Sequence, residues 1–298
     1  MADKAHKQTD KILAAMEQRL SAIYSRAARE TGISWKEYLK DSTAEIDELQ
    51  KIYDEAKKSG DQTEIRKSGM NLSRAKREQT IQNKRFKELS QQTAEEISHI
   101  NETALAYING QLPEVYALNY NDLDGRIRGY SFTLTDANTV KSLAESDKNL
   151  LPYKYINGKK DIRWNVQKIN SEVLQGILQG ESMDKIANRF SNVMAMDETS
   201  AIRNARTTVT SAECKGRQDS YEQAEKDGII IKREWIATND SRTRHWHADL
   251  DGVLVGINEP WHNEFGDIMY PGDPSADPAN VYNCRCTIAA KVVGFKKK

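Results

Sequence analysis

Proline is distributed unevenly along this chain, and its positions limit where long helices can form. Proline is absent from the first 112 residues, and four of the six prolines follow Glu259. Proline breaks helices and favours turns, so long helices are predicted first and a compact, turn-rich module last. Tryptophan and histidine follow the same trend, with three of five tryptophans after Glu234 and three of five histidines after Arg244.

Three segments follow from this distribution. We predict an extended helical, coiled-coil-like region over residues 1–112, a helical connector over 113–180 and a small module over 181–298. The fold class is α+β: a long charged helical N-terminal region, a helical middle, and a C-terminal module with a mostly antiparallel sheet.

The first region carries a helical pattern of apolar residues. They recur at steps of three and four: Ile12, Leu13, Met16, Leu20, Ile23 and Ala27. Gly32 is expected to end this helix. Ser34 and Glu37 have capping-box spacing and predict the start of a second helix, which stops near Ser59 and Gly60. From about residue 64 to 112 a narrow apolar stripe predicts a helical stalk or hairpin.

Capping residues divide the middle of the chain. Asp161 is expected to cap a helix that Gly180 closes, Ser182 to cap a shorter helix, and a third, long helix to end at Gly228. The sequence SFTLT at 131–135 predicts a short strand.

Near the C-terminus the pattern changes to that of strands. Residues 229–238 are rich in β-branched and aromatic side chains and end at turn formers. Residues 253–255 and 286–293 predict two further strands. Together these segments predict a small antiparallel sheet with helices packed on it.

Composition excludes several classes of protein. The 44 basic residues balance 44 acidic ones, which excludes a globally basic nucleic-acid coat protein. No apolar stretch approaches the roughly 18 residues of a membrane span, and the N-terminus lacks the apolar core of a secretory signal. We therefore expect a soluble, unsecreted protein without a membrane anchor. Three cysteines, an odd number, fit a reducing compartment, and Cys214 is expected to be a core thiol.

A basic segment lies between residues 66 and 87. It carries one acid, Glu78, and eight basic residues, for a local charge of +7: Arg66, Lys67, Arg74, Lys76, Arg77, Lys84, Arg85 and Lys87. A helix of this density suits contact with the phosphate backbone of double-stranded DNA. The alternative is a solvated coiled-coil face whose acidic partners lie on the helix over 45–55.

The segment 239–252, NDSRTRHWHADLDG, contains the residue types of a nuclease. His247 would be the base, Arg242 and Arg244 would clamp phosphate, and Asp251 would bind a metal. This enzyme is the alternative to a structural role.

The structural alternative is an arginine network that ties this segment to Glu234 or Asp273 by ion pairs. The following sequence, YPGDPSADP at 270–278, alternates turn-forming residues. Pro271 and Gly272 predict a rigid loop that holds the segment from His245 to Gly252 against the last strand.

The sequence NCRC brings two of the three cysteines together. Cys284 and Cys286 can both face a metal only if the residue between them is turned. Zinc is a candidate cofactor here, with His247 as a third ligand and His245 or His262 as a fourth. The alternative is a pair of reduced cysteines partly buried in a strand and no cofactor.

The order of these motifs is similar to that of phage minor head proteins of the Mu F-like head morphogenesis family. The resemblance covers about residues 180–293 and rests on five motifs: IRNARTTVTSA, EWIAT, DSRTRHWHADLDG, YPGDP and VYNCRC. Family positions map onto Arg206, Arg242, Arg244, His247, Leu250, Asp251, Gly252, Cys284 and Cys286. His245 is an addition in this chain. Further positions expected to be structural are Asp240, Pro271, Gly272 and Asn283.

The resemblance implies a structural protein of tailed-phage heads, present in few copies. It implies association with portal and capsid proteins in the head interior, assembly in the host cytoplasm and, in some members, passage into the host with the DNA. It implies no demonstrated catalysis. We expect a homo-oligomer formed through the helical region, and a C-terminal module in which the segment 240–252 meets the NCRC sequence.

Overall fold

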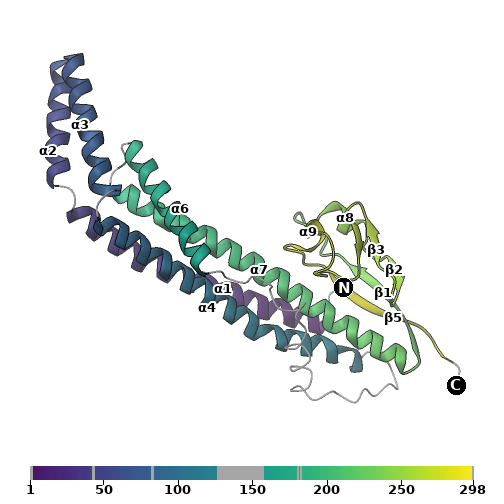
Figure 1. The fold of residues 1–298 in the computed structure, drawn as a ribbon. Coiled ribbons are helices and arrows are strands. Elements are labelled where there is room, and N and C mark those ends of the chain that lie inside the picture. The colour runs from purple at the N-terminus through teal and green to yellow at the C-terminus, as the bar shows by residue number, and fades with distance from the viewer. Residues whose placement is uncertain are drawn as a thin grey trace. The chain divides into compact units, whose positions relative to one another are not determined.

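The computed structural model describes residues 3–41, 44–81, 84–125, 158–179, 181 and 183–296. Long helices precede a small C-terminal antiparallel sheet, which confirms the α+β class (Figure 1). The chain divides into two compact units. Unit 1 consists of residues 1–20, 104–154 and 200–298, and unit 2 of residues 21–103 and 155–199.

Unit 2 is helical. It contains α2 (Ala44–Ser59), α3 (Gln62–Ile81), α6 (Gly158–Leu178) and parts of three helices shared with unit 1, α1 (Lys4–Asp41), α4 (Lys84–Tyr120) and α7 (Met183–Lys226). Its core is built around aromatic side chains. Trp35 packs edge-on against Phe86, with ring centroids 5.5 Å apart, and donates its indole N–H to Thr93 Oγ1 at 3.1 Å.

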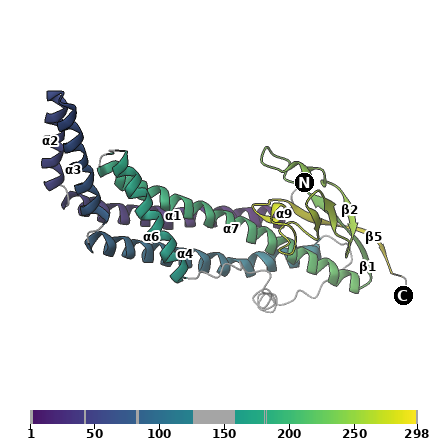
Figure 2. The same ribbon diagram turned by 45° about the horizontal axis from the view of Figure 1, so that its top comes forward.

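Helices α2 and α3 form a hairpin and run side by side in both views (Figures 1 and 2). Gly60 makes the turn with a φ of 78°. Asp61 then caps α3, because its carboxylate accepts from the backbone N–H of Thr63 at 2.8 Å. This agrees with the predicted stop near Ser59 and Gly60.

The predicted helix end at Gly32 was wrong. Helix α1 continues through Gly32 to Asp41, and Ser34 does not cap a second helix but donates back to the carbonyl of Glu30 at 3.3 Å. The reason is a buried face that continues past the glycine, through Trp35 and Tyr38. Burying these side chains outweighs the roughly 1 kcal/mol that a mid-helix glycine costs.

Two other predicted boundaries differ from the structure. Helix α4 runs through Pro113 to Tyr120, and residues 183–226 form one helix, α7, where two were expected. Asp161 lies in the first turn of α6, which begins at Gly158. The predicted strand 131–135, Gly180 and Ser182 lie outside the described residues.

All three predicted C-terminal strands are present and form one antiparallel sheet in the order β2-β1-β5. Strand β1 (Ile229–Ile236) lies between β2 (Leu254–Gly256) and β5 (Thr287–Phe295). Ile236 pairs with Thr287 at one end of the β1–β5 ladder and Ile229 with Phe295 at the other. Alternate residues of β1 are buried, as period-2 geometry requires.

A second, two-stranded sheet was not predicted. Strands β3 (Trp261–Asn263) and β4 (Gly266–Ile268) form a hairpin, and two short helices, α8 (His245–Ala248) and α9 (Pro278–Val281), complete the module. Trp261 packs edge-on against Trp235 in the core, with centroids 5.3 Å apart. Among the described helices, none has an apolar stretch long enough to cross a membrane.

Candidate metal centre

The loop between β1 and β2 is fastened to the end of β1. The side chain of Asp251 accepts from the backbone N–H of Ala237 at 2.8 Å and from the amide of Asn239 at 2.7 Å. Gly252, with a φ of 77°, donates its N–H to the carbonyl of Trp235 at 2.8 Å. Asp251 and Gly252, at the end of the loop, therefore bind the residues at its start.

The same loop is tied to the Cys-Arg-Cys segment. Arg285 donates both terminal nitrogens to the carboxylate of Asp240, at 2.6 and 2.7 Å, and its carbonyl accepts from Thr238 Oγ1 at 2.8 Å. Arg244 donates to the carbonyl of Tyr282. The predicted meeting of the two segments is confirmed.

The acceptors in this network differ from the predicted ones. The expected partners of the arginines were Glu234 and Asp273, whereas the structure uses Asp240 and a backbone carbonyl. Glu234 lies on β1, and Asp273 instead accepts from the backbone N–H of Ser275 at 2.9 Å. The network is therefore confined to the loop and the Cys-Arg-Cys segment.

Replacing Asp240 by asparagine is expected to destabilise the loop most above about pH 4, and progressively less as the pH falls further. Hydrogen bonds from Arg285 hold the pKa of Asp240 well below its ordinary value of about 3.9. A lowered folded-state pKa means that the carboxylate stabilises the fold above the unfolded pKa and loses this effect as the pH falls towards the folded pKa. Urea unfolding of wild type and Asp240→Asn at pH 7 and near pH 3 should show a difference that shrinks in acid.

Asp249→Asn, at an exposed position of the same segment, is the matched control. It should leave the unfolding midpoint unchanged at both pH values. A difference between wild type and Asp240→Asn that stays constant with pH would contradict the role given to the Arg285 pair.

Three side chains that can bind a metal converge between this loop and the Cys-Arg-Cys segment. His247, on α8, points its Nδ1 at Cys284 Sγ and Cys286 Sγ, at 3.6 and 3.7 Å. The three donor atoms lie within 4.8 Å of one another, and each residue is at most 3 % exposed. Arg285 turns the other way, to Asp240, so the two cysteines share the inner side of the segment before β5.

The two thiols of this cluster differ in acidity. The pKa of Cys286 is lowered by a hydrogen bond from the Cys284 thiol and, further, by His247. The pKa of Cys284 is raised by the same hydrogen bond and by burial. Cys214 lies apart, with its thiol 3.8 Å from the carbonyl of Cys286, and burial raises its pKa. The cluster therefore favours a thiolate on Cys286, and Cys214 is the predicted core thiol.

The four residues of the nuclease hypothesis do not converge. His247 is buried among the cysteines, whereas the Arg242 side chain is 66 % exposed and lies 4.0 Å from Asp240. Arg244 and Asp251 are engaged in holding the backbone of the loop. These four side chains thus share no space in which they could act on one phosphate.

Two of the remaining motif residues lie on or against the helices and core of unit 1. Arg206, on α7, pairs with Glu17 on α1, with 2.5 Å between Nε and Oε1. Leu250 is buried in the core that includes the strands of the C-terminal module. Both therefore have structural roles.

The other motif residues shape turns beside α7. Asn283 adopts a φ of 59° and donates its N–H to Thr207 Oγ1 on α7 at 2.9 Å. Pro271 and Gly272 are buried in a turn closed by a hydrogen bond of 3.0 Å from the backbone N–H of residue 273 to the carbonyl of residue 270. These contacts agree with the rigid loop that the sequence predicted.

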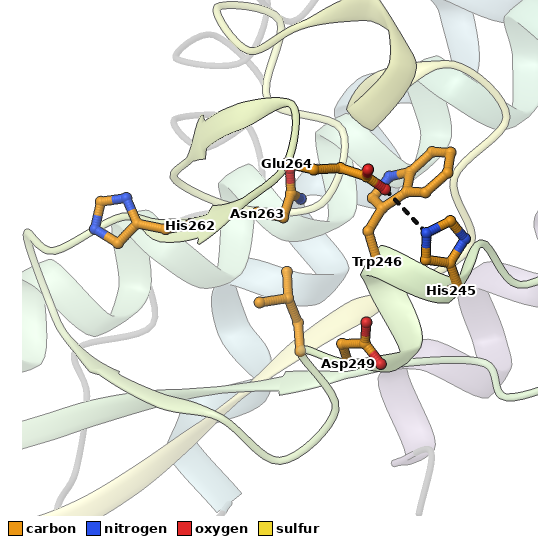
Figure 3. Close-up of a pocket in the computed structure, with 7 residues that line it drawn as sticks. His245, Trp246, Asp249, His262, Asn263 and Glu264 are labelled. Carbon is orange, nitrogen blue, oxygen red and sulfur yellow. Dashed lines mark ion pairs between the residues drawn. The ribbon is translucent and has the colours of Figure 1, made fainter.

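His245 and His262, the other proposed zinc ligands, are exposed and lie outside the cluster. They line a surface cavity of about 420 Å³ together with Trp246, Asp249 and Glu264. His245 Nε2 lies 3.0 Å from Glu264 Oε1, and the His262 side chain lies away from both (Figure 3). Neither histidine can serve as the fourth ligand in this arrangement.

Sequence reasoning missed a buried arginine next to the site. Arg233 is fully buried in β1 and stacks over the Trp261 ring, with the guanidinium carbon 4.7 Å from the ring centroid. The alternation of a β-strand predicts that this side chain is buried, because residues 229, 231, 233 and 235 share the inner face of β1. Basic residues are rarely buried, so it was not singled out.

Comparison with known proteins defines the class. Residues 167–289 match the family described as Phage Mu protein F like protein. This span includes all of α7, strands β1 to β4, the first residues of β5 and the His-Cys-Cys cluster. Residues 167–289 are thus Mu F-like, which confirms the resemblance drawn from the motifs.

Two curated proteins are similar to it. The chain is 26 % identical over 188 residues to minor head protein GP7 of Bacillus phage SPP1, covering 63 % of this chain and 59 % of that protein. It is 33 % identical over 133 residues to NAD(+)--arginine ADP-ribosyltransferase EFV of Enterococcus faecalis (strain ATCC 700802 / V583), covering 43 % of this chain and 26 % of that protein. The chain therefore spans less than two thirds of either relative. No solved structure matches significantly.

Proposed function

We propose that this chain is a structural component of a phage head, associated with portal and capsid proteins in the head interior. The observation that supports it best is the similarity to a minor head protein, which extends over 63 % of the chain and so beyond the Mu F-like segment. The loop before β2 has contacts that suit a structural role, because Asp251 and Arg244 hold backbone groups and Asp240 pairs with Arg285.

In this proposal the C-terminal module is a rigid docking unit, the helical region forms homo-oligomers, and assembly takes place in the host cytoplasm. Mass spectrometry of particles purified from the encoding phage or lysogen tests it. The chain should be present in few copies relative to the major capsid protein and should co-purify with the portal protein. Its absence from purified particles would overturn the proposal.

We further propose that the basic segment of α3 and α4 contacts packaged double-stranded DNA, with which the protein would leave the head. Five of the eight basic side chains are exposed: Arg66, Lys67, Arg74, Arg85 and Lys87. Lys76 is half-buried and donates to Gln50 on α2 at 3.1 Å. The side chains of Arg77 and Lys84 are outside the description.

Reversing the charge of three exposed cations on α3 is expected to weaken DNA binding. For each phosphate that the variant no longer neutralises, the slope of log Kd against log salt concentration should decrease by about 0.9. The triple variant Arg66→Glu/Lys67→Glu/Arg74→Glu should bind at least about tenfold more weakly than wild type. Electrophoretic mobility shift across a salt series measures both quantities on the full chain.

Lys232→Glu/Lys291→Glu is the control for charge reversal outside the basic segment. These lysines are exposed, pair across β1 and β5, and lie outside the basic segment. The control should bind DNA nearly as wild type does. Equal affinity and salt slope for wild type and the triple variant would remove α3 from the DNA-binding surface.

A further inference from the structure

The distances within the His-Cys-Cys cluster match those of a metal site. In a tetrahedral zinc centre, Zn–S bonds of about 2.3 Å and Zn–N bonds of about 2.05 Å place a nitrogen and a sulfur ligand about 3.6 Å apart. His247 Nδ1 lies 3.6 Å from Cys284 Sγ and 3.7 Å from Cys286 Sγ. Both separations thus have the value that a shared zinc ion requires.

The chemistry of the donors selects the kind of metal. Two thiolates and an imidazole are soft to intermediate ligands, which zinc prefers and which magnesium and calcium do not. The three residues are 2–3 % exposed, so a metal here would be screened from solvent. Among the described residues, this is the one group of His, Cys, Asp and Glu whose donor atoms converge to this extent.

The protein holds the ligands in place from outside the cluster. The carbonyl of Cys284 accepts from Thr210 Oγ1 at 2.7 Å, and Asp240 anchors Arg285, which lies between the two cysteines. The His247 ring packs edge-on against Trp235, with centroids 5.2 Å apart. Such outer contacts orient the ligands before the metal binds and raise the affinity of the site for the metal.

We propose that His247, Cys284 and Cys286 bind one zinc ion through Nδ1 and the two sulfurs. The ion joins α8 to the residues before β5, which are 37 and 39 positions away in sequence. Its role is structural, because it would fix the loop that carries Asp240 to the sheet. This inference does not depend on the proposed association with phage heads.

Metal analysis of the full chain tests the proposal. Protein expressed with added zinc and dialysed against metal-free buffer should retain one zinc per chain by mass spectrometry. Cys284→Ser, Cys286→Ser and His247→Ala should lose the metal. Two matched controls, Cys214→Ser for the cysteine outside the cluster and His245→Ala for the neighbouring histidine, should keep it.

A second measurement covers the case in which the ligand variants do not fold. Cobalt(II) added to zinc-free wild type should give a thiolate-to-cobalt charge-transfer band in the near ultraviolet and intense visible bands of a tetrahedral site, and zinc should abolish them. Cys214→Ser should give the same spectrum. Folded wild type that holds no zinc and shows no thiolate band with cobalt would overturn the proposal. Retention of one zinc by both Cys284→Ser and Cys286→Ser would also overturn it.

Discussion

Arg233→Met is expected to lower the free energy of unfolding of unit 1 by about 3–5 kcal/mol. The guanidinium donates to the carbonyl of Gly256, at 3.0 and 3.2 Å, and to Gln218 Oε1 at 2.8 Å. It also donates to the carbonyls of Glu259 and Met269. Methionine retains much of the packing but removes this donor, and each buried acceptor left unpaired costs about 1–3 kcal/mol. The carbonyl of Gly256 still accepts from the backbone N–H of Glu259 at 3.2 Å, so the loss falls on the other three acceptors.

The charge of Arg233 is retained at neutral pH. Burial lowers the pKa of this guanidinium to about 10, which is still far above neutrality. Arg233→Lys keeps the charge but loses the planar arrangement of donors. Its free energy of unfolding should therefore lie between those of wild type and Arg233→Met. This order separates the geometry of the hydrogen bonds from the charge itself.

Urea unfolding followed by tryptophan fluorescence measures the effect, since Trp235 and Trp261 lie in the same core. Lys232→Met, at the adjacent exposed position of β1, is the control and should change stability by less than about 0.5 kcal/mol. If Arg233→Met lowers the free energy of unfolding by less than about 1 kcal/mol, water replaces the guanidinium at these carbonyls and the prediction is wrong.

Gly272→Ala is expected to destabilise unit 1 by about 2–5 kcal/mol, from two additive causes. Gly272 has a φ of 80°, which costs a residue with a side chain about 1–2 kcal/mol. A Cβ atom here would lie 2.8 Å from the backbone nitrogen and 2.9 Å from the Cα of Ser211 on α7. This overlap is with helix backbone, which cannot move as a side chain can, and adds about 1–3 kcal/mol.

Gly252→Ala separates the two causes. Gly252 has a similar φ of 77°, but a Cβ atom there would have no neighbour within 4 Å. It should therefore show the backbone cost alone, about 1–2 kcal/mol in the same urea experiment. Equal destabilisation by the two substitutions would mean that the turn containing Gly272 can move away from α7 without cost.

The sequence predicted the elements whose patterns are long or strongly periodic. The β-branched run from Ile229 identified β1, and the stripe that includes Met16 and Leu20 identified α1. Gly32 was misread because local propensity favours a break there, whereas the buried face of α1 continues to Tyr38. Such a face is decided by tertiary packing, which one helix's sequence does not contain.

The short elements were beyond sequence reasoning for a different reason. Strands β3 and β4 have three residues each, too few to display an alternating pattern. The candidate metal centre was predicted in part: Cys284, Cys286 and His247 were named together, and the structure brings them together. The choice of a fourth ligand from His245 and His262 failed, because spacing along the chain does not reveal which side of a turn a ring faces.

The single arginine between the two cysteines makes this stretch intolerant of changes in length. Inward and outward positions alternate residue by residue in an extended chain, so inserting or deleting one amino acid just before Cys284 would carry Arg285 into the apolar interior and both sulfurs to the surface. Point substitutions here would weaken one interaction at a time. Inserting or deleting one residue would instead reverse the orientation of all three side chains at once.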